Sequence, residues 1–166
     1  MNSVYISQGQ HAVGKDEDMV VSTLLGSCIS ICLWDPVAGV GGMNHLLLPD
    51  LRAAGDDVTA GAVDMDLLIN KMMTFGAVRP RLRAKLFGGS SMLNGRTDIG
   101  ARNAAFGKTY LANEGIPCDA ENVGGTKARR LKFWPATGAV KMLLVTEQVP
   151  EPTPAPEPKA NDVELF

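Results

Sequence analysis

Cys28 and His45 are the two side chains in this sequence best suited to nucleophilic chemistry. Cys28 follows Gly26 and Ser27, which bend the chain where a strand begins, and His45 lies near the end of a later strand-like segment. A cysteine attacks as its thiolate, and a free thiol titrates near ~8.5, so an adjacent imidazole would lower that pKa and later return a proton. The residues alone leave the ordinary alternative open, in which Cys28 is a small buried apolar group and His45 is structural.

Other chemistry-bearing residues do not form a recognisable metal or nucleotide site. Cys28 and Cys32 share one strand face, but a zinc site needs four ligands, and neither histidine stands at a ligand spacing from a cysteine. Neither a Gly-x-Gly-x-x-Gly motif nor a phosphate-binding loop occurs. We therefore expect no metal and no nucleotide cofactor.

Two glycine pairs and a basic cluster stand outside these motifs. The pairs at 88–89 and 124–125 are typical of tight turns at strand ends. The cluster of Lys127, Arg129 and Arg130 after the second pair is either an anion-binding group or a solvated loop.

The segments that must position Cys28 and His45 are mostly strands. Residues 19–24, 28–34 and 40–48 are rich in aliphatic and β-branched side chains, and Asp35, Pro36 and Gly39 supply a turn between the last two. Within 28–34 the residues alternate, with Ile29, Ile31 and Leu33 on one face of the predicted strand and Cys28, Ser30, Cys32 and Trp34 on the other. Further strands are predicted at 84–87, 130–133 and 140–146, the last two as a second hairpin.

Two helices complete the prediction. Residues 60–75 carry Met65, Leu68, Ile69 and Met72 at helical spacing, and a second helix is expected over 102–114, before Gly115 and Pro117. Because strands outnumber helices and do not alternate with them, the pattern predicts an α+β domain.

The end of the chain has a different composition. Five of the ten prolines lie between positions 150 and 158, where alternating proline disfavours both helix and sheet. We therefore predict a folded domain over 1–149 and a Pro-rich, disordered tail over 150–166. Its last residues, NDVELF, are either solvated or a short docking peptide carried on a proline spacer.

The charge balance and the missing targeting signals limit the function classes. With 16 Lys and Arg against 18 Asp and Glu, the net charge of −2 argues against a nucleic-acid-binding protein. No apolar run approaches the ~18 residues of a membrane span, and the first residues resemble no export signal. Three irregularly spaced cysteines do not form a disulfide framework. The sequence thus predicts a reduced, cytoplasmic protein without membrane insertion.

One stretch resembles a known family. LGSCISICLWDPVAGVGGMNHLLLP, residues 25–49, is similar to the signature of CheD, the chemoreceptor glutamine deamidase family of bacterial and archaeal chemotaxis. Further marks follow in the family's order: KLFGG at 85–89 with Met92, Ile99-Gly100-x-Arg102-Asn103, Gly124-Gly125 with Arg129, and Thr137-Gly138. The resemblance spans about residues 4–145, nearly the whole predicted domain.

The resemblance implies roles for individual residues. Cys28 would be the nucleophile and His45 the general base. A third family residue, a threonine that holds the histidine, maps onto Ser22, with Thr23 adjacent, so either hydroxyl qualifies. Backbone amides of the loop at Gly26 and Ser27, together with that of Cys28, would stabilise an oxyanion.

The motif at 99–103 would support a binding surface. Arg102 and Asn103 belong to this surface for substrate or partner, although Asn103 could also simply initiate a helix.

The activity implied is hydrolysis of glutamine side chains on the cytoplasmic helices of chemoreceptors to glutamate, with release of ammonia and without a cofactor. A methylesterase activity on receptor glutamates is a secondary expectation. The alternative is a non-catalytic adaptor that binds receptors or a CheC-type phosphatase. The implied architecture is a layered α/β/β sandwich with mixed sheets and flanking helices, related to deamidases of the cytotoxic necrotizing factor type.

Overall fold

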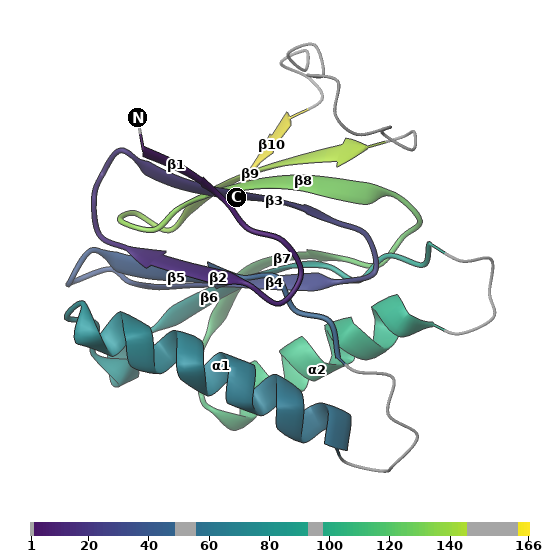
Figure 1. The fold of residues 1–166 in the computed structure, drawn as a ribbon, viewed down its shortest axis with the longest axis horizontal. Helices are drawn as coiled ribbons and strands as arrows, with labels where there is room; N and C mark the ends of the chain where they lie inside the picture. The colour runs from purple at the N-terminus through teal and green to yellow at the C-terminus, as the bar shows by residue number, and fades with distance from the viewer. Residues whose placement is uncertain (1, 49–55, 93–97, 146–162) are drawn as a thin grey trace.

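The chain folds into three layers, two β-sheets stacked on each other and a layer of two helices against one of them (Figure 1). The computed structural model describes residues 2–48, 56–92, 98–145 and 163–166. We call the sheet between the other two layers the central sheet and the remaining sheet the outer sheet.

The central sheet has the strand order β2-β5-β4-β6-β7. Its strands are β2 (His11–Gly14), β4 (Ile29–Asp35), β5 (Val40–Asn44), β6 (Arg83–Gly88) and β7 (Cys118–Val123). All neighbouring pairs are antiparallel except β6 and β7, which run parallel. The sheet is therefore mixed, and β4, which begins next to Cys28, lies in its middle.

The outer sheet has the order β1-β3-β8-β9-β10. Its strands are β1 (Asn2–Tyr5), β3 (Met19–Leu25), β8 (Ala128–Trp134), β9 (Ala139–Val145) and β10 (Val163–Leu165). Only the β1–β3 pair is parallel. β3 thus belongs to one sheet and β4 to the other, and the short segment between them carries the nucleophile candidate.

Both helices cover the central sheet. α1 (Asp56–Thr74) packs on β5 and β2, and α2 (Ile99–Asn113) packs on β6 and β4. A short 3₁₀ helix, η1 (Arg79–Arg81), precedes β6. The stripe of Met65, Leu68, Ile69 and Met72 predicted from the sequence is fully buried and holds α1 on the sheet. No helix of the described residues is long and apolar enough to cross a membrane.

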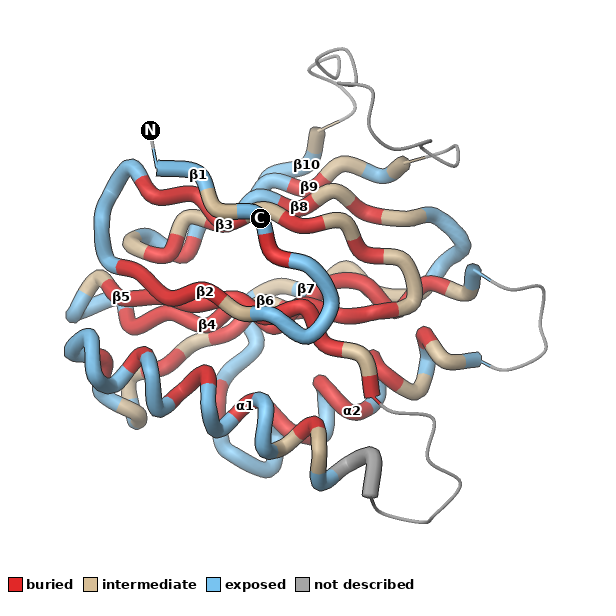
Figure 2. Tube along the Cα trace, in the orientation of Figure 1, coloured by how far each residue is buried: buried red, intermediate tan, exposed pale blue. Residues whose placement is uncertain are grey.

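The two faces of β4 belong to two different apolar cores. Ile29, Ile31 and Leu33 pack in the core between the central sheet and the helices. Cys32 and Trp34 point to the other core, between the two sheets, and Cys28 lies in that core as well. Figure 2 shows buried residues along the whole of β4 and β5. The alternation predicted for this strand is confirmed.

The predicted fold class, a layered α+β domain with mixed sheets and flanking helices, is confirmed. The two antiparallel hairpins, β4–β5 and β8–β9, are those expected from the turn residues. Both helices start earlier than predicted. α2 begins at Ile99, where the Asp98 side chain accepts a hydrogen bond from the Ala101 amide at 2.9 Å and caps the first turn.

The end of the chain is part of the outer sheet. The predicted boundary at 149–150 and the proline run lie outside the described residues. Val163–Leu165, however, form β10 on the edge of β9. The last residues of the predicted tail thus pair with the domain's own sheet, and the domain boundary and the disorder of the proline run stay predictions.

Candidate active site

Cys28 ends the segment 26–28, which crosses from β3 in the outer sheet to β4 in the central sheet; we call it the crossing segment. Backbone hydrogen bonds hold it in place. The three carbonyls of this segment each accept a hydrogen bond: Gly26 from the Ser90 amide (3.1 Å), Ser27 from the Asn103 side chain (2.8 Å) and Cys28 from the Gly89 amide (2.9 Å). The amides of Ser27 and Cys28, by contrast, have no acceptor within the described residues. A fixed backbone therefore leaves two unpaired donors beside the thiol, as an oxyanion site requires.

The end of β6 packs directly behind Cys28. Gly88 has φ +108°, and a Cβ added there would lie 2.2 Å from the Cys28 carbonyl oxygen. Gly89, Gly124 and Gly125 also have positive φ, so both glycine pairs form the tight turns expected from the sequence. Only glycine at 88 lets β6 approach the Cys28 backbone this closely.

His45 lies one residue beyond β5, and its backbone and its side chain are both bound. Its amide donates to the Gln10 carbonyl (3.0 Å), and its carbonyl accepts from the Gly9 amide (2.9 Å). Its Nδ1 lies 2.7 Å from Thr23 Oγ1, in the outer sheet. The imidazole therefore bridges the two sheets, with 8% of the residue exposed.

The Thr23 hydroxyl determines which nitrogen of His45 carries the proton. Thr23 Oγ1 donates to the Ile6 carbonyl oxygen at 2.7 Å, and a carbonyl can only accept. The single hydroxyl proton is thus used, so the contact with His45 has Nδ1–H as donor and Thr23 as acceptor. Neutral His45 consequently keeps an unprotonated Nε2, the form in which an imidazole can act as a base.

Cys28 and His45 approach each other through the pairing of β4 with the residues after β5. Ile29 and Leu46 exchange two backbone hydrogen bonds, of 3.0 and 2.8 Å, in an antiparallel bridge. This register places Cys28 diagonally across from His45 on the face toward the outer sheet, where cross-strand Cα atoms stand about 7–8 Å apart. The Cys28 thiol and the His45 ring form no hydrogen bond with each other in this structure, and such bonds often form only with substrate bound.

Asn44 interrupts the regular ladder next to His45. Its Oδ1 accepts the Ile31 amide at 2.8 Å, and its Nδ2 lies 3.1 Å from Met65 Sδ. The side chain thus replaces a backbone partner and fastens the end of β5 to β4 and α1. The residue directly before His45 is therefore held in place by its side chain.

Burial sets the protonation of the candidate pair. It raises the pKa of the Cys28 thiol above its ordinary value and lowers the pKa of His45 below its ordinary value. Both shifts favour the neutral forms, a thiol and an imidazole. Desolvation is the cause of both shifts, and the lowering of the Cys28 pKa by a protonated His45 stays a prediction.

Of the two hydroxyls considered beside His45, only Thr23 contacts it. Thr23 is buried on the same face of β3 as Val21 and Leu25, whereas Ser22 lies on the opposite face, half-buried. The backbone carbonyl of Ser22 accepts the Ile6 amide at 2.9 Å, which holds the segment that carries the acceptor of the Thr23 hydroxyl.

Asn103 joins the two segments of the candidate site. Its Nδ2 donates to the Ser27 carbonyl at 2.8 Å, and its Oδ1 accepts the Leu48 amide at 3.1 Å. The residue is fully buried in α2, one turn beyond the helix start. Asp98, and not Asn103, caps the helix, and both polar atoms of the Asn103 side chain are bound within the fold; its role in binding a substrate or partner stays a prediction.

Arg102 is only partly buried, but it too binds the protein itself. Its Nη2 donates to the Leu48 carbonyl at 3.1 Å. Leu48 lies three residues after His45. Its backbone N–H is bonded to Asn103 and its carbonyl to Arg102, both in α2. Arg102 and Asn103 thus both contact segments of the candidate site, and their role in binding a substrate or partner stays a prediction.

Arg129 is a structural residue within the predicted basic cluster. The residue is 4% exposed, and its guanidinium donates to four acceptors of the surrounding loops: Asn122 Oδ1 (2.9 Å), Gly88 O (3.3 Å), Ser90 Oγ (2.7 Å) and Gly124 O (2.8 Å). These bonds tie the two glycine turns together behind Cys28. Arg129 is thus unavailable to an external anion, while Lys127 is exposed.

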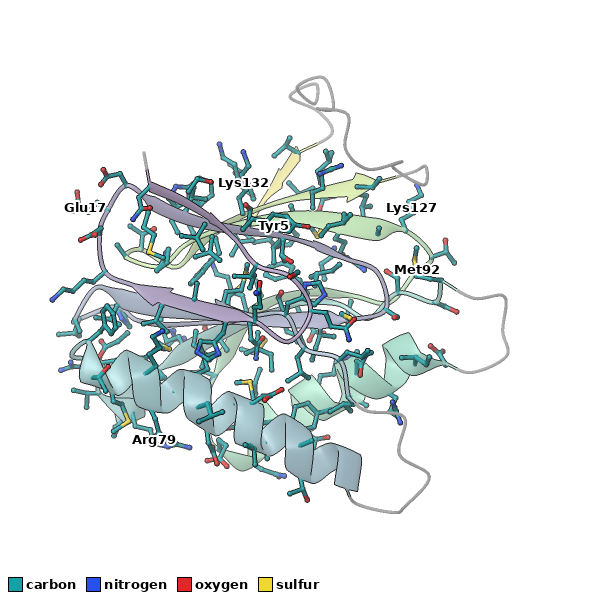
Figure 3. All side chains as sticks on the ribbon, in the orientation of Figure 1. Tyr5, Glu17, Arg79, Met92, Lys127 and Lys132 are labelled. Atoms are coloured by element: carbon teal, nitrogen blue, oxygen red, sulfur yellow. The ribbon has the colours of Figure 1, made fainter. Side chains whose placement is uncertain are left out.

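Met92 lies on the solvent side of the crossing segment. A Cβ added at Gly26 would lie 3.4 Å from Met92 Cγ, and 45% of Met92 is exposed. Met92 and Lys127 occupy the same end of the two sheets (Figure 3). An exposed apolar side chain therefore lies against Gly26, two residues before Cys28.

Comparison with known proteins identifies the family. A family model described as CheD chemotactic sensory transduction matches residues 47–143. A protein of Caulobacter sp. (strain K31), named "Probable chemoreceptor glutamine deamidase CheD", is 49% identical over 98% of this chain and 92% of its own length. A protein of Agrobacterium fabrum with the same name is 42% identical over 98% of this chain and 96% of its own length.

Solved structures share less with this chain. The crystal structure of Bacillus licheniformis hypothetical protein YfiH aligns with a TM-score of 0.43 and 15% identity over 67% of this chain and 49% of that chain. The crystal structure of Neisseria meningitidis protein NMB0706, family-model DUF152, aligns with a TM-score of 0.44 and 11% identity over 75% of this chain and 63% of that chain. The relation to cytotoxic necrotizing factor deamidases stays a prediction. The sequence relatives, which align over nearly the full chain, place this protein in the CheD family.

Proposed function

We propose that this protein is a chemoreceptor glutamine deamidase in which Cys28 is the nucleophile, His45 the general base and acid, and Thr23 the residue that orients His45. The observation that carries the proposal is the hydrogen-bond chain from the Ile6 carbonyl through Thr23 to His45 Nδ1. It leaves Nε2 as the basic nitrogen on a ring near Cys28. Family membership supports the substrate, a glutamine side chain of a chemoreceptor.

The first half of the reaction forms a thioester. Because the resting thiol is protonated, His45 Nε2 removes the Cys28 proton as Sγ attacks the carboxamide carbon of the substrate. The amides of Ser27 and Cys28 donate to the oxygen that becomes negative. The tetrahedral intermediate collapses when His45 gives its proton to the nitrogen, and ammonia leaves.

The second half hydrolyses the thioester. His45 Nε2 takes a proton from water, whose oxygen attacks the acyl carbon, and the proton then returns to Sγ as the C–S bond breaks. The products are glutamate and the free enzyme, and every proton is accounted for without a cofactor. An ester carbonyl would enter the same sequence with methanol as the leaving group, so methylesterase activity is a secondary expectation.

The substrate and the partners are part of the proposal. A receptor helix would present its glutamine past Met92, whose exposed side chain offers an apolar contact beside Gly26. The reaction would take place in the cytoplasm, where the signalling helices of chemoreceptors lie. A CheC-type phosphatase is the further partner, sharing the receptor-binding surface.

The test is the intact mass of a receptor cytoplasmic fragment after incubation with the protein. Each deamidation replaces an amide by an acid and adds about one dalton. We expect Cys28→Ala to lower the rate at least ~1000-fold, the usual scale for losing a nucleophile. Cys32→Ala is the matched control on the same strand face and should keep turnover while lowering stability by about 1 kcal/mol.

Two results would contradict the assignment. One is a dead Cys32→Ala beside an active Cys28→Ala. The other is a wild-type protein that binds the receptor fragment but leaves its mass unchanged, which would favour the adaptor alternative.

A further inference from the structure

The last residues of the chain occupy the edge of the outer sheet. Val163, Glu164 and Leu165 pair in antiparallel register with Leu143, Met142 and Lys141 of β9. Phe166 continues the ladder with two backbone bonds to Val140, of 3.0 and 2.8 Å. Without this strand the backbone groups of β9 on that side would be unpaired, an edge able to accept another strand.

One side chain anchors this strand to the rest of the domain. The Phe166 ring meets the Phe87 ring edge to face, with centroids 5.2 Å apart. Phe87 is fully buried in β6 of the central sheet, so Phe166 links the edge of the outer sheet to the central sheet within the core between them. Leu165, in contrast, is 73% exposed and adds little burial.

The connection to this strand is much longer than a hairpin needs. Residues 146–162, with five prolines, separate β9 from β10, whereas two to five residues commonly close an antiparallel pair. A longer connection makes closure entropically less favourable. With one aromatic anchor and a few backbone bonds, β10 is held weakly compared with the inner strands.

We propose that the β9 edge over 140–143, together with Phe87, is a binding site for an extended peptide with an aromatic residue opposite Val140. This chain fills the site with its own Val163–Phe166, and the bound strand exchanges with the same sequence supplied by another molecule. The recognition is β-strand addition: backbone bonds supply the register, and the ring that packs on Phe87 supplies selectivity.

The test uses a fluorescent peptide of sequence NDVELF and the full-length chain. Phe166→Ala removes the anchor and vacates the site, so this variant should bind the peptide at least about 10-fold more tightly than the wild type, whose tethered strand competes. Leu165→Ala is the matched control and should bind like the wild type. A peptide with alanine in place of its phenylalanine should not bind Phe166→Ala.

Absence of peptide binding to a folded Phe166→Ala variant would overturn the proposal, as would equal binding to variant and wild type. If that variant fails to fold, hydrogen exchange of the wild type decides. The Val140 amide, bonded to Phe166, should exchange at least ~10-fold faster than the Leu131 amide inside the sheet. Equal protection would show that the strand does not dissociate separately from the domain.

Discussion

The two ends of β4 hold polar groups in opposite situations. At one end the buried Asp35 carboxylate accepts hydrogen bonds from the amides of Val37, Ala38 and Val78 and from the Arg81 guanidinium. Burial by itself would raise the pKa of Asp35, but these bonds together lower it to about 2. Every charge at this end has its partner within the fold.

At the other end the polar groups are incompletely paired. The Ser27 and Cys28 amides have no acceptor in the described part of the chain, and the fully buried Ser30 hydroxyl, two residues further on, has no partner there either. Burial alone shifts the pKa values of Cys28 and His45. A buried group with all its partners stabilises the fold, whereas unpaired donors around a nucleophile are suited to a reacting substrate.

At the Cys28 end of β4, which we call the reactive end, the largest effect is expected from removing the hydrogen bond between Thr23 and His45. Thr23→Val keeps the shape of the side chain but loses the acceptor for Nδ1–H, so Nε2 is no longer the defined base. We expect kcat to fall about 100-fold with a smaller change in KM. Steady-state deamidation of a receptor fragment measures both.

Ser22→Ala is the control for that change, since Ser22 lies on the opposite face of β3. It should alter kcat less than about twofold. A Ser22→Ala protein as impaired as Thr23→Val would contradict the role given to Thr23.

At the Asp35 end of β4, Asp35→Asn should lower the stability of the fold and leave the deamidation rate unchanged. Asp35 has a lower pKa folded than unfolded, so its contribution is fully present above about pH 4 and disappears as the pH falls toward 2. The variant should lose about 2 kcal/mol of unfolding free energy at pH 7 and little near pH 2. Urea titrations at both pH values measure this, and unchanged turnover of the folded variant separates the two ends of β4. A stability loss that is equal at both pH values would contradict the assignment.

Asn103 tests whether the reactive end depends on support from α2. Asn103→Ala leaves the Ser27 carbonyl and the Leu48 amide without their partner, so we expect a roughly 10-fold lower kcat together with reduced stability. Asn113→Ala, at the exposed end of the same helix, should change neither by a measurable amount. Full turnover per folded Asn103→Ala molecule would show that the two bonds serve stability alone.

The sequence predicted the elements with strong patterns and missed those without them. The alternation of β4 and the helical stripe of α1 are long enough to decide their type. β1, β2 and β7 are short or polar, and the parallel pairing of β7 with β6 depends on contacts distant in sequence. β10 follows a proline run, and its partner strand could not be inferred from its own residues.

The same limit applies inside the site. Cys28 and His45 were predicted from their residue types and from the family's motif. Ser22 and Thr23 could not be separated, because Val20 and Leu24 make one face of β3 as apolar as Val21 and Leu25 make the other. The role of Asn103 depended on where α2 begins. With the helix starting at Ile99 and not at 102, Asn103 lies inside the helix, where its buried side chain bonds both Ser27 and Leu48.

The Ile6 carbonyl has a consequence for how this site responds to mutation. The group that consumes the Thr23 proton is a peptide oxygen, and every amino acid placed at position 6 supplies one. Alanine scanning would therefore record only lost packing at Ile6 and would not detect its link to the tautomer of His45. Substituting the peptide bond itself, or shifting the register of β1 against β3, would reveal that link. The link to His45 therefore depends on the main-chain path of residues 2–6, whereas the Ile6 side chain contributes packing in the core between the two sheets.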